Sequence, residues 1–166
     1  MEVKLQSENL ELKNDAVVKF FRLSNHATPP RKSTENAAGL DLFSAHNVTI
    51  PAWGGCVRIE TDLQILIPEG CYGRIASRSS LAYQNVHVMA GVVDADFWGN
   101  LAVLLLNMTD ADFEVRRGDS IGQIILEKIY SPSIVESKII HPATARREHG
   151  FGLDSSTADS PKELGK

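Results

Sequence analysis

The residues of this chain most able to do chemistry stand in a short turn between two apolar segments. Asp94 and Asp96 lie between Val92–Val93 and the run Leu101–Leu106. A carboxylate within hydrogen-bond reach of a water molecule can act as a general base. Aspartate is also common in ordinary turns. The turn alone therefore leaves a catalytic and a purely structural interpretation open.

The segments on either side of this turn predict a β-hairpin. Val92 and Val93 are strand formers, and the apolar run Leu101–Leu106 is typical of a fully buried strand. Gly91 and Gly99 supply backbone freedom at the two ends of the turn. We therefore expect two paired strands with the carboxylates at their tip.

Four further segments combine small residues with charged or polar ones. They are Ala37–Leu42 (AAGLDL), Gly73–Ala82 (GRIASRSSLA), Arg117–Gln123 (RGDSIGQ) and Arg146–Gly152 (RREHGFG). Their arginines are few and separated, in a chain with a formal net charge of −4. Basic groups that bind an anion must therefore be gathered locally by the fold.

Length and composition limit the classes of protein to consider. The 166 residues, with 43% hydrophobic and 23% charged residues, fit one globular domain with a substantial core. The net charge of −4 leaves no basic footprint for nucleic acid, and the run Leu101–Leu106 is too short to span a membrane. The first residues lack the apolar core of a signal peptide. We expect an intracellular protein, cytoplasmic or nuclear, that binds neither nucleic acid nor membrane.

The elements that must position these residues are short strands separated by turn formers. Such a pattern predicts an all-β sandwich, jelly roll or barrel in residues 16–140, with one helical turn near 77–83. Residues 1–15 and 141–166 are expected to be mobile arms. The strand candidates are 17–23, 39–44, 48–50, 56–62, 63–67, 71–75, 86–89, 113–115, 121–130 and 134–140.

Taken together, the five segments resemble, in order, spacing and content, the five motifs of the trimeric deoxyuridine triphosphate nucleotidohydrolase (dUTPase) family. The resemblance extends from about Val17 to Gly152. It implies a dUTPase-like β-clip or jelly roll with one short helix and a flexible C-terminal arm that carries the fifth motif. It also implies hydrolysis of dUTP to dUMP and pyrophosphate by a homotrimer with shared active sites.

The resemblance assigns roles around the triphosphate. Asp94 takes the place of the residue that activates water for attack at the α-phosphorus. Arg78 would face the phosphates, and Ser79 would bind the bridging oxygen beside the scissile bond. Ser80 stands where the family usually has glycine, so a slightly different or tighter loop is expected, because serine resists positive φ. Asp41 would hold water molecules of a Mg²⁺ ion that arrives with the substrate.

The turn and its flanks would bind the nucleoside. The backbone around Gly91 and Val93 would read the edge of uracil. Phe97 replaces a tyrosine whose ring packs under the deoxyribose, so discrimination against a 2′-hydroxyl should survive. Trp98 replaces a common arginine, and two interpretations stay open: contact with a protein partner, or a ring folded back on its own chain.

Later motifs would complete the site. Gln123 would contact the phosphate chain, Arg146 would neutralise the γ-phosphate, and Phe151, followed by Gly152, would stack on uracil. Arg147 and His149 replace two glycines of the family pattern, so the arm should be stiffer.

Two alternatives stay open, because this chain departs from the dUTPase motifs at several residues and because another family has the same fold. One is a protein of the same fold that acts mainly by binding nucleotide or a protein partner, with weak or no turnover. The other is a dCTP deaminase, which the segment Arg78–Ala82 also resembles. Deamination needs a proton-carrying glutamate in the strand after the turn, where this chain has Leu104. Deaminase activity is therefore not expected.

Overall fold

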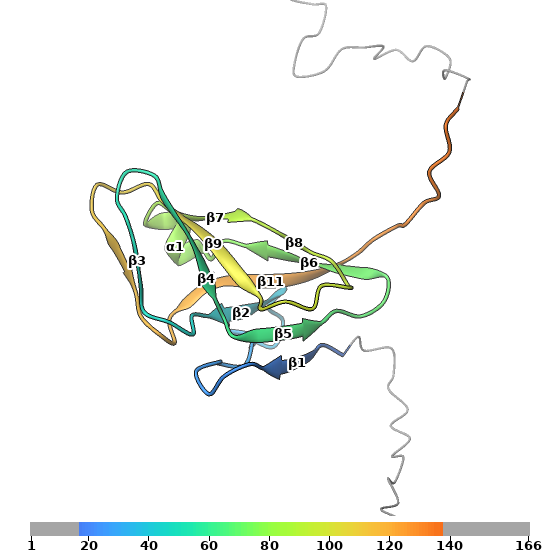
Figure 1. Ribbon diagram of the computed structural model, residues 1–166, viewed down its shortest axis with the longest axis horizontal. Helices are drawn as coiled ribbons and strands as arrows, with labels where there is room; N and C mark the ends of the chain where they lie inside the picture. Colours follow the sequence, from blue (N-terminus) through green and yellow to red (C-terminus); the bar gives the residue numbers. More distant parts are fainter. Residues whose placement is uncertain (1–16, 138–166) are drawn as a thin grey trace, which may run out of the picture. The chain divides into compact units, whose positions relative to one another are not determined.

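The computed structural model describes residues 17–137, so the predicted arms at 1–15 and 141–166 lie outside the described residues. The described part holds eleven strands and one short helix (Figure 1). The fold is all-β, as predicted. In chain order the elements are β1 (Lys19–Arg22), β2 (Gly39–Phe43), β3 (Val48–Ile50), β4 (Gly55–Glu60), β5 (Leu63–Leu66), β6 (Cys71–Ala76), α1 (Ser79–Tyr83), β7 (Val86–Ala90), β8 (Val92–Val93), β9 (Ala102–Asn107), β10 (Phe113–Val115) and β11 (Ser120–Lys128).

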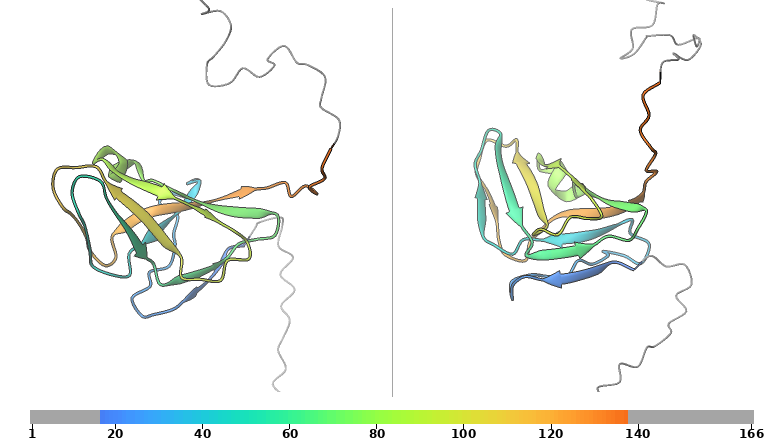
Figure 2. Two further views of the ribbon diagram at one scale, coloured as in Figure 1. Left: turned by 45° about the horizontal axis from the view of Figure 1, so that its top comes forward. Right: turned by 45° about the vertical axis from the view of Figure 1, so that its right-hand side comes forward.

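All strand pairs are antiparallel and form two main sheets. One sheet has the order β2-β11-β6-β8 and the other the order β4-β9-β7. Two smaller pairs, β1 with β5 and β10 with β3, complete the described part. In both views of Figure 2, β1 lies beside β5.

The core lies between the inner faces of these sheets. β9 shows how it is built, because Val103 and Leu105 are fully buried while Leu104 and Leu106 are only half-buried. The prediction of a fully buried strand was therefore wrong. The strand alternates, since only one of its faces packs against the core, and its other face is apolar as well.

The prediction that Val92–Val93 and Leu101–Leu106 pair as a hairpin is also wrong, although the turn between them is correctly located. β8 pairs with β6, with Val93 opposite Gly73, whereas β9 pairs with β4 and β7. The two limbs thus belong to different sheets and diverge. The strand predicted at 134–140 is absent over 134–137, and its last three residues lie outside the described residues.

A buried carboxylate joins three distant segments beside β5. Asp62 is 7% exposed and accepts hydrogen bonds from Ser24 Oγ at 2.6 Å and Asn100 Nδ2 at 2.9 Å, while His46 Nε2 lies 3.3 Å away. These contacts, that of Ser24 foremost, lower the pKa of Asp62 against the opposing effect of burial. The ionised carboxylate therefore stabilises the folded state.

We predict that Asp62→Asn lowers the free energy of unfolding at pH 7 by about 2 kcal/mol, the scale of a hydrogen bond to a charged group. Asparagine tolerates the positive φ of 52° at this position, so the change tests the charge. Because the folded-state pKa lies below the unfolded value of 3.8, the stabilisation is present above that pH and is lost as pH falls through the folded-state pKa.

Urea denaturation between pH 7 and pH 2 measures this difference. It should shrink below about pH 3.8, because the unfolded chain then takes up a proton at Asp62 more readily than the folded chain does. Asp110→Asn, at an exposed position, is the matched control and should leave stability nearly unchanged. A deficit in Asp62→Asn that stays constant down to pH 2 would contradict the account.

Candidate functional site

Three of the predicted site residues meet on one face of the four-stranded sheet. Asp41 of β2 lies opposite Gln123 of β11, which in turn lies opposite Ala76 of β6. Arg78 Nε lies 3.2 Å from Asp41 Oδ1, and Gln123 Nε2 donates a hydrogen bond of 3.1 Å to the carbonyl of Ser77. We call Asp41, Arg78 and Gln123 the polar cluster. Three motifs far apart in the sequence thus form one group.

The segment between β6 and α1 places Arg78 in this cluster. Ser77 Oγ accepts a hydrogen bond from Val88 N at 2.8 Å, which fixes the segment to β7. Arg78 occupies the N-cap position of α1 and makes no side-chain cap bond, so its side chain is available to Asp41. Ser79 and Ser80 are exposed in the first turn of the helix.

Ser80 does not take the place of a left-handed glycine. Among non-glycine residues of the described part, only Trp53, Asp62 and Asn85 have positive φ. Ser80 instead continues the helix that begins at Ser79. Serine is therefore compatible with this local backbone.

Gly39 makes room for the Gln123 side chain. A Cβ atom at Gly39 would collide with the Gln123 side-chain carbonyl group. A side chain at position 39 would therefore have to displace the Gln123 amide.

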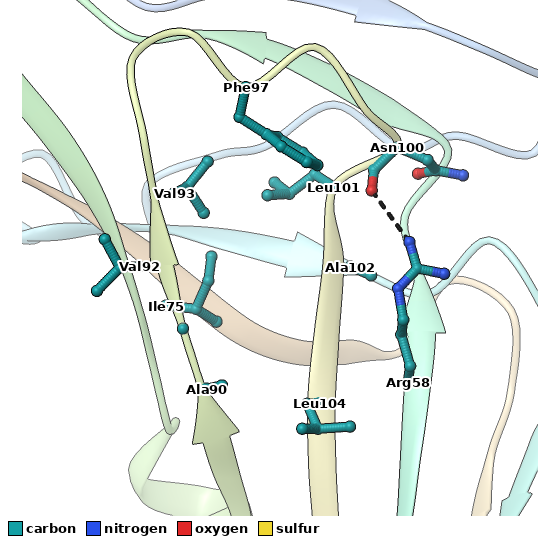
Figure 3. Close-up of a pocket in the computed structure, with 11 residues that line it drawn as sticks. Arg58, Ile75, Ala90, Val92, Val93, Phe97, Asn100, Leu101, Ala102 and Leu104 are labelled. Carbon is teal, nitrogen blue, oxygen red and sulfur yellow. Dashed lines mark hydrogen bonds between the residues drawn. The ribbon is translucent and has the colours of Figure 1, made fainter.

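A second group of predicted residues lines a cavity of about 310 Å³ between the diverging strands β8 and β9. Gly91, Val93 and Phe97 belong to its wall, together with Asn100 and Leu104. Figure 3 shows the Phe97 ring reaching from the turn toward Leu101. The cavity exists because the limbs join different sheets, and its wall is mainly apolar. It suits the flat, weakly polar faces of an aromatic base.

Arg58 also lines this cavity, although it belongs to none of the predicted site residues. It lies on β4 opposite Leu104 of β9. Its guanidinium forms an ion pair of 2.5 Å with Glu60 and donates to the Asn100 carbonyl at 3.4 Å (Figure 3). Only strand register brings Arg58 to this wall, so no local motif could have revealed it. Leu104, the position considered for a deaminase glutamate, contributes an aliphatic side chain to the same wall.

Asp94 stands apart from the polar cluster within one chain. It is exposed at the start of the turn, and its carbonyl accepts a hydrogen bond of 3.1 Å from Phe97 N. Val93 lies opposite Gly73, five residues before Arg78, which corresponds to about 16 Å of strand. The antiparallel direction carries Asp94 further from Arg78. Figure 1 shows α1 and the loop after β8 at opposite ends of β6.

The structure brings none of the remaining predicted residues that it describes into the polar cluster or the cavity of about 310 Å³. Arg146, Phe151 and Gly152 lie outside the described residues. The Trp98 ring is 76% exposed and lies at a second cavity of about 230 Å³, beside Phe20 and Phe21. The ring is thus not buried against its own chain, and a protein partner at Trp98 stays a prediction.

Within the described residues, the Asp41 carboxylate and the group of His46, Glu60 and Asp62 are the two places to test for a metal ion. The ion pair with Arg78 engages Oδ1 of Asp41, so Oδ2 can accept a hydrogen bond from a metal-bound water. Ligand atoms of His46, Glu60 and Asp62 lie within 4.8 Å of one another. Asp62 is already satisfied by three side chains and Glu60 by Arg58. Asp41 therefore fits the predicted water-mediated role, and the second group is held together without an ion.

Comparisons with known proteins agree with this arrangement of motifs. A family model described as dUTPase matches residues 25–155. The chain belongs to the dUTPase family. It is 44% identical over 147 residues to the deoxyuridine 5′-triphosphate nucleotidohydrolase of Rattus norvegicus, covering 88% of this chain and 71% of the relative. The enzyme of the same name from fowl adenovirus A is 47% identical over 134 residues, 80% of this chain and 74% of the viral protein.

Solved dUTPase structures share the fold. A Staphylococcus bacteriophage 80alpha dUTPase mutant with dUpNHpp aligns with a TM-score of 0.75 and 23% identity, covering 82% of this chain and 96% of the phage chain. A mutant dUTPase of phage phi11, described with a structural Mg(II) ion, aligns with a TM-score of 0.70 and 22% identity over 76% of this chain and 99% of the phage chain.

Among the described residues, no helix is both long and apolar enough to cross a membrane.

We predict that Gly39→Ala displaces the Gln123 amide and lowers the free energy of unfolding by about 1–3 kcal/mol, the usual cost of overpacking. Thermal and urea denaturation measure the loss. Gly91→Ala is the control, because an added Cβ there meets no atom within 4 Å. Equal stability of the two variants would show that the polar cluster does not need the space at Gly39.

Proposed function

We propose that this chain hydrolyses dUTP to dUMP and pyrophosphate, with Asp94 activating the attacking water. The observation that carries the proposal is the convergence of Asp41, Arg78 and Gln123, in a chain that also has an apolar cavity for a base. A charged cluster suits a phosphate chain, and the cavity suits a pyrimidine. A substrate of this site should therefore have a phosphate chain and a pyrimidine base. Membership of the dUTPase family supports dUTP as that substrate.

The chemistry asks little of the protein beyond placing water and stabilising charge. The Asp94 carboxylate accepts a proton from water as the water oxygen bonds to the α-phosphorus. The bond from the α-phosphorus to the bridging oxygen breaks, and pyrophosphate leaves with the electron pair. Ser79 would donate a hydrogen bond to that bridging oxygen. Arg78 and Gln123 would stabilise the charge that develops on the phosphates.

We propose that each site is shared between copies of the chain, in a homotrimer. Water attack and leaving-group stabilisation occur within a few ångströms of one phosphorus atom. In a single chain, however, Asp94 and Arg78 lie near opposite ends of β6, more than about 16 Å apart along the strand. A site that uses both must take them from two copies. Arg146 and Phe151 would come from the C-terminal arm.

We further propose that Mg²⁺ accompanies the substrate. Asp41 would hold it through water, since Oδ1 serves Arg78 and Oδ2 can face a metal-bound water. Oxygen ligands and retained waters are what Mg²⁺ prefers. When bound, the ion supplies positive charge to the triphosphate. A structural Mg(II) ion in a phage dUTPase structure supports the choice of metal.

A role confined to binding is not favoured, because the curated relatives are named nucleotidohydrolases. The intracellular location, cytoplasmic or nuclear, stays a prediction. Relatives from Homo sapiens and Dictyostelium discoideum carry names that include mitochondrial.

We predict that Asp94→Asn reduces kcat for dUTP by about 10²–10⁴-fold, the usual contribution of a positioned general base, while KM changes little. Pyrophosphate release with Mg²⁺ present measures the rate. Asp96→Asn, an exposed carboxylate two residues away, is the matched control and should keep nearly full activity. Undiminished release by Asp94→Asn would remove this residue from the mechanism.

A further inference from the structure

Arg31 lies beside the polar cluster, although no motif includes it. It pairs with Asp41 in an isolated antiparallel bridge next to the edge strand β2. Asp41 N donates to the Arg31 carbonyl at 2.8 Å, and Arg31 N donates to the Asp41 carbonyl at 3.4 Å. Directly opposite residues in such a pair place their side chains on the same face, with Cα atoms about 5.5 Å apart. Arg31 therefore extends the row that begins at Ala76 and passes through Gln123 and Asp41.

The guanidinium of Arg31 is held by an aromatic ring. Its Cζ atom lies 4.9 Å from the centroid of Phe43, which is only 4% exposed and follows Asp41 by two residues on the same face of β2. A guanidinium stacked on a ring keeps its N–H groups free at its edge. This geometry orients the donors without using them.

The loop that carries Arg31 is anchored on both sides. Before it, Ala27 is buried and His26 Nδ1 lies 3.0 Å from Arg117 Nη1. After it, Ala37 N donates to the Thr34 carbonyl at 3.0 Å. Arg31 is thus carried by a segment that the structure fixes in place.

The charges around Asp41 are not balanced. Within residues 17–137, Arg78 forms the ion pair with Asp41, and Arg31 forms none. Arg31 thus adds a second guanidinium to the sheet face that carries Asp41 and Arg78, and these three charges leave an excess of one positive charge there. Such an excess favours a polyanion, and arginine is suited to in-plane recognition of phosphate oxygens.

We propose that Arg31 is a further substrate-binding residue, which contacts the phosphates of dUTP beyond the α-phosphate. The proposal rests on the proposed function, because it takes the polar cluster as the phosphate site. Ser79, which would bind the bridging oxygen next to the α-phosphorus, follows the Ala76 end of the row, whereas Arg31 lies beyond Asp41 at the other end. Arg31 therefore contributes to binding of the triphosphate and not of the monophosphate.

Calorimetric titration with dUpNHpp and with dUMP tests this contact, together with the rate of dUTP hydrolysis. Arg31→Gln should weaken dUpNHpp binding about tenfold, the scale of one charge-assisted hydrogen bond, and leave dUMP binding unchanged. Arg31→Lys should keep part of the affinity, because it keeps the charge but not the planar donors. Lys32→Gln removes the same charge one residue away, at an exposed side chain whose one hydrogen-bond partner within residues 17–137 is the Glu35 carbonyl. This variant should bind both ligands like the unmodified chain.

The outcomes separate this inference from the proposed function. Hydrolysis of dUTP by the unmodified chain with equal dUpNHpp affinity in Arg31→Gln would overturn the role of Arg31 alone. An equal loss for dUMP and dUpNHpp in Arg31→Gln would also overturn it, since the effect would not depend on the outer phosphates. Absence of hydrolysis and of dUpNHpp binding in the unmodified chain would overturn both. Thermal denaturation of each variant verifies that it is folded.

Discussion

The position of β6 between β11 and β8 is the constraint on which the rest of the structure depends. Its pairing with β11 puts Ala76 in the row with Gln123 and Asp41, and its pairing with β8 puts Val93 opposite Gly73. One strand thus fixes the polar cluster at one end and the turn with Asp94 at the other. The hydrogen-bonded ladder is stiff, so a single copy cannot bring the two ends together.

The same topology separates two kinds of chemistry. The polar cluster gathers a carboxylate, a guanidinium and an amide on one sheet face. The cavity instead results from the divergence of β8 and β9 into different sheets, and its wall is mainly apolar. A nucleoside triphosphate has a matching division, with a strongly charged end and a weakly polar base.

Local sequence signals predicted most element positions, because glycine, proline and polar turn formers mark the ends of short strands. These signals failed where pairing between residues far apart in the sequence determines the sheet in which a strand lies. Val92–Val93 and Leu101–Leu106 look like the arms of one hairpin, yet β8 finds its partner in β6. The outer face of β9 is as apolar as its inner face, so the sequence could not show the alternation of Leu104 and Leu105.

The candidate site shows the same division. Asp41, Arg78 and Gln123 are predictable from motifs, and the structure brings them together. Arg58 and Arg31 lie outside the motifs. The register of β4 with β9 reveals where Arg58 lies, and the bridge to Asp41 reveals where Arg31 lies. The buried contacts of Asp62 were equally invisible, because their partners are 16 to 38 residues away in the sequence.

The most direct test of a site shared between copies is complementation between two inactive variants. Asp94→Asn and Arg78→Ala would be co-expressed in equal amounts, and pyrophosphate release from dUTP would be measured on the mixed assembly. If each site takes Asp94 from one copy and Arg78 from another, about a quarter of the sites contain both native residues in a random cyclic oligomer. The account predicts recovery of about a quarter of native activity. Activity no higher than that of either variant alone, in assemblies shown to be mixed, would contradict it.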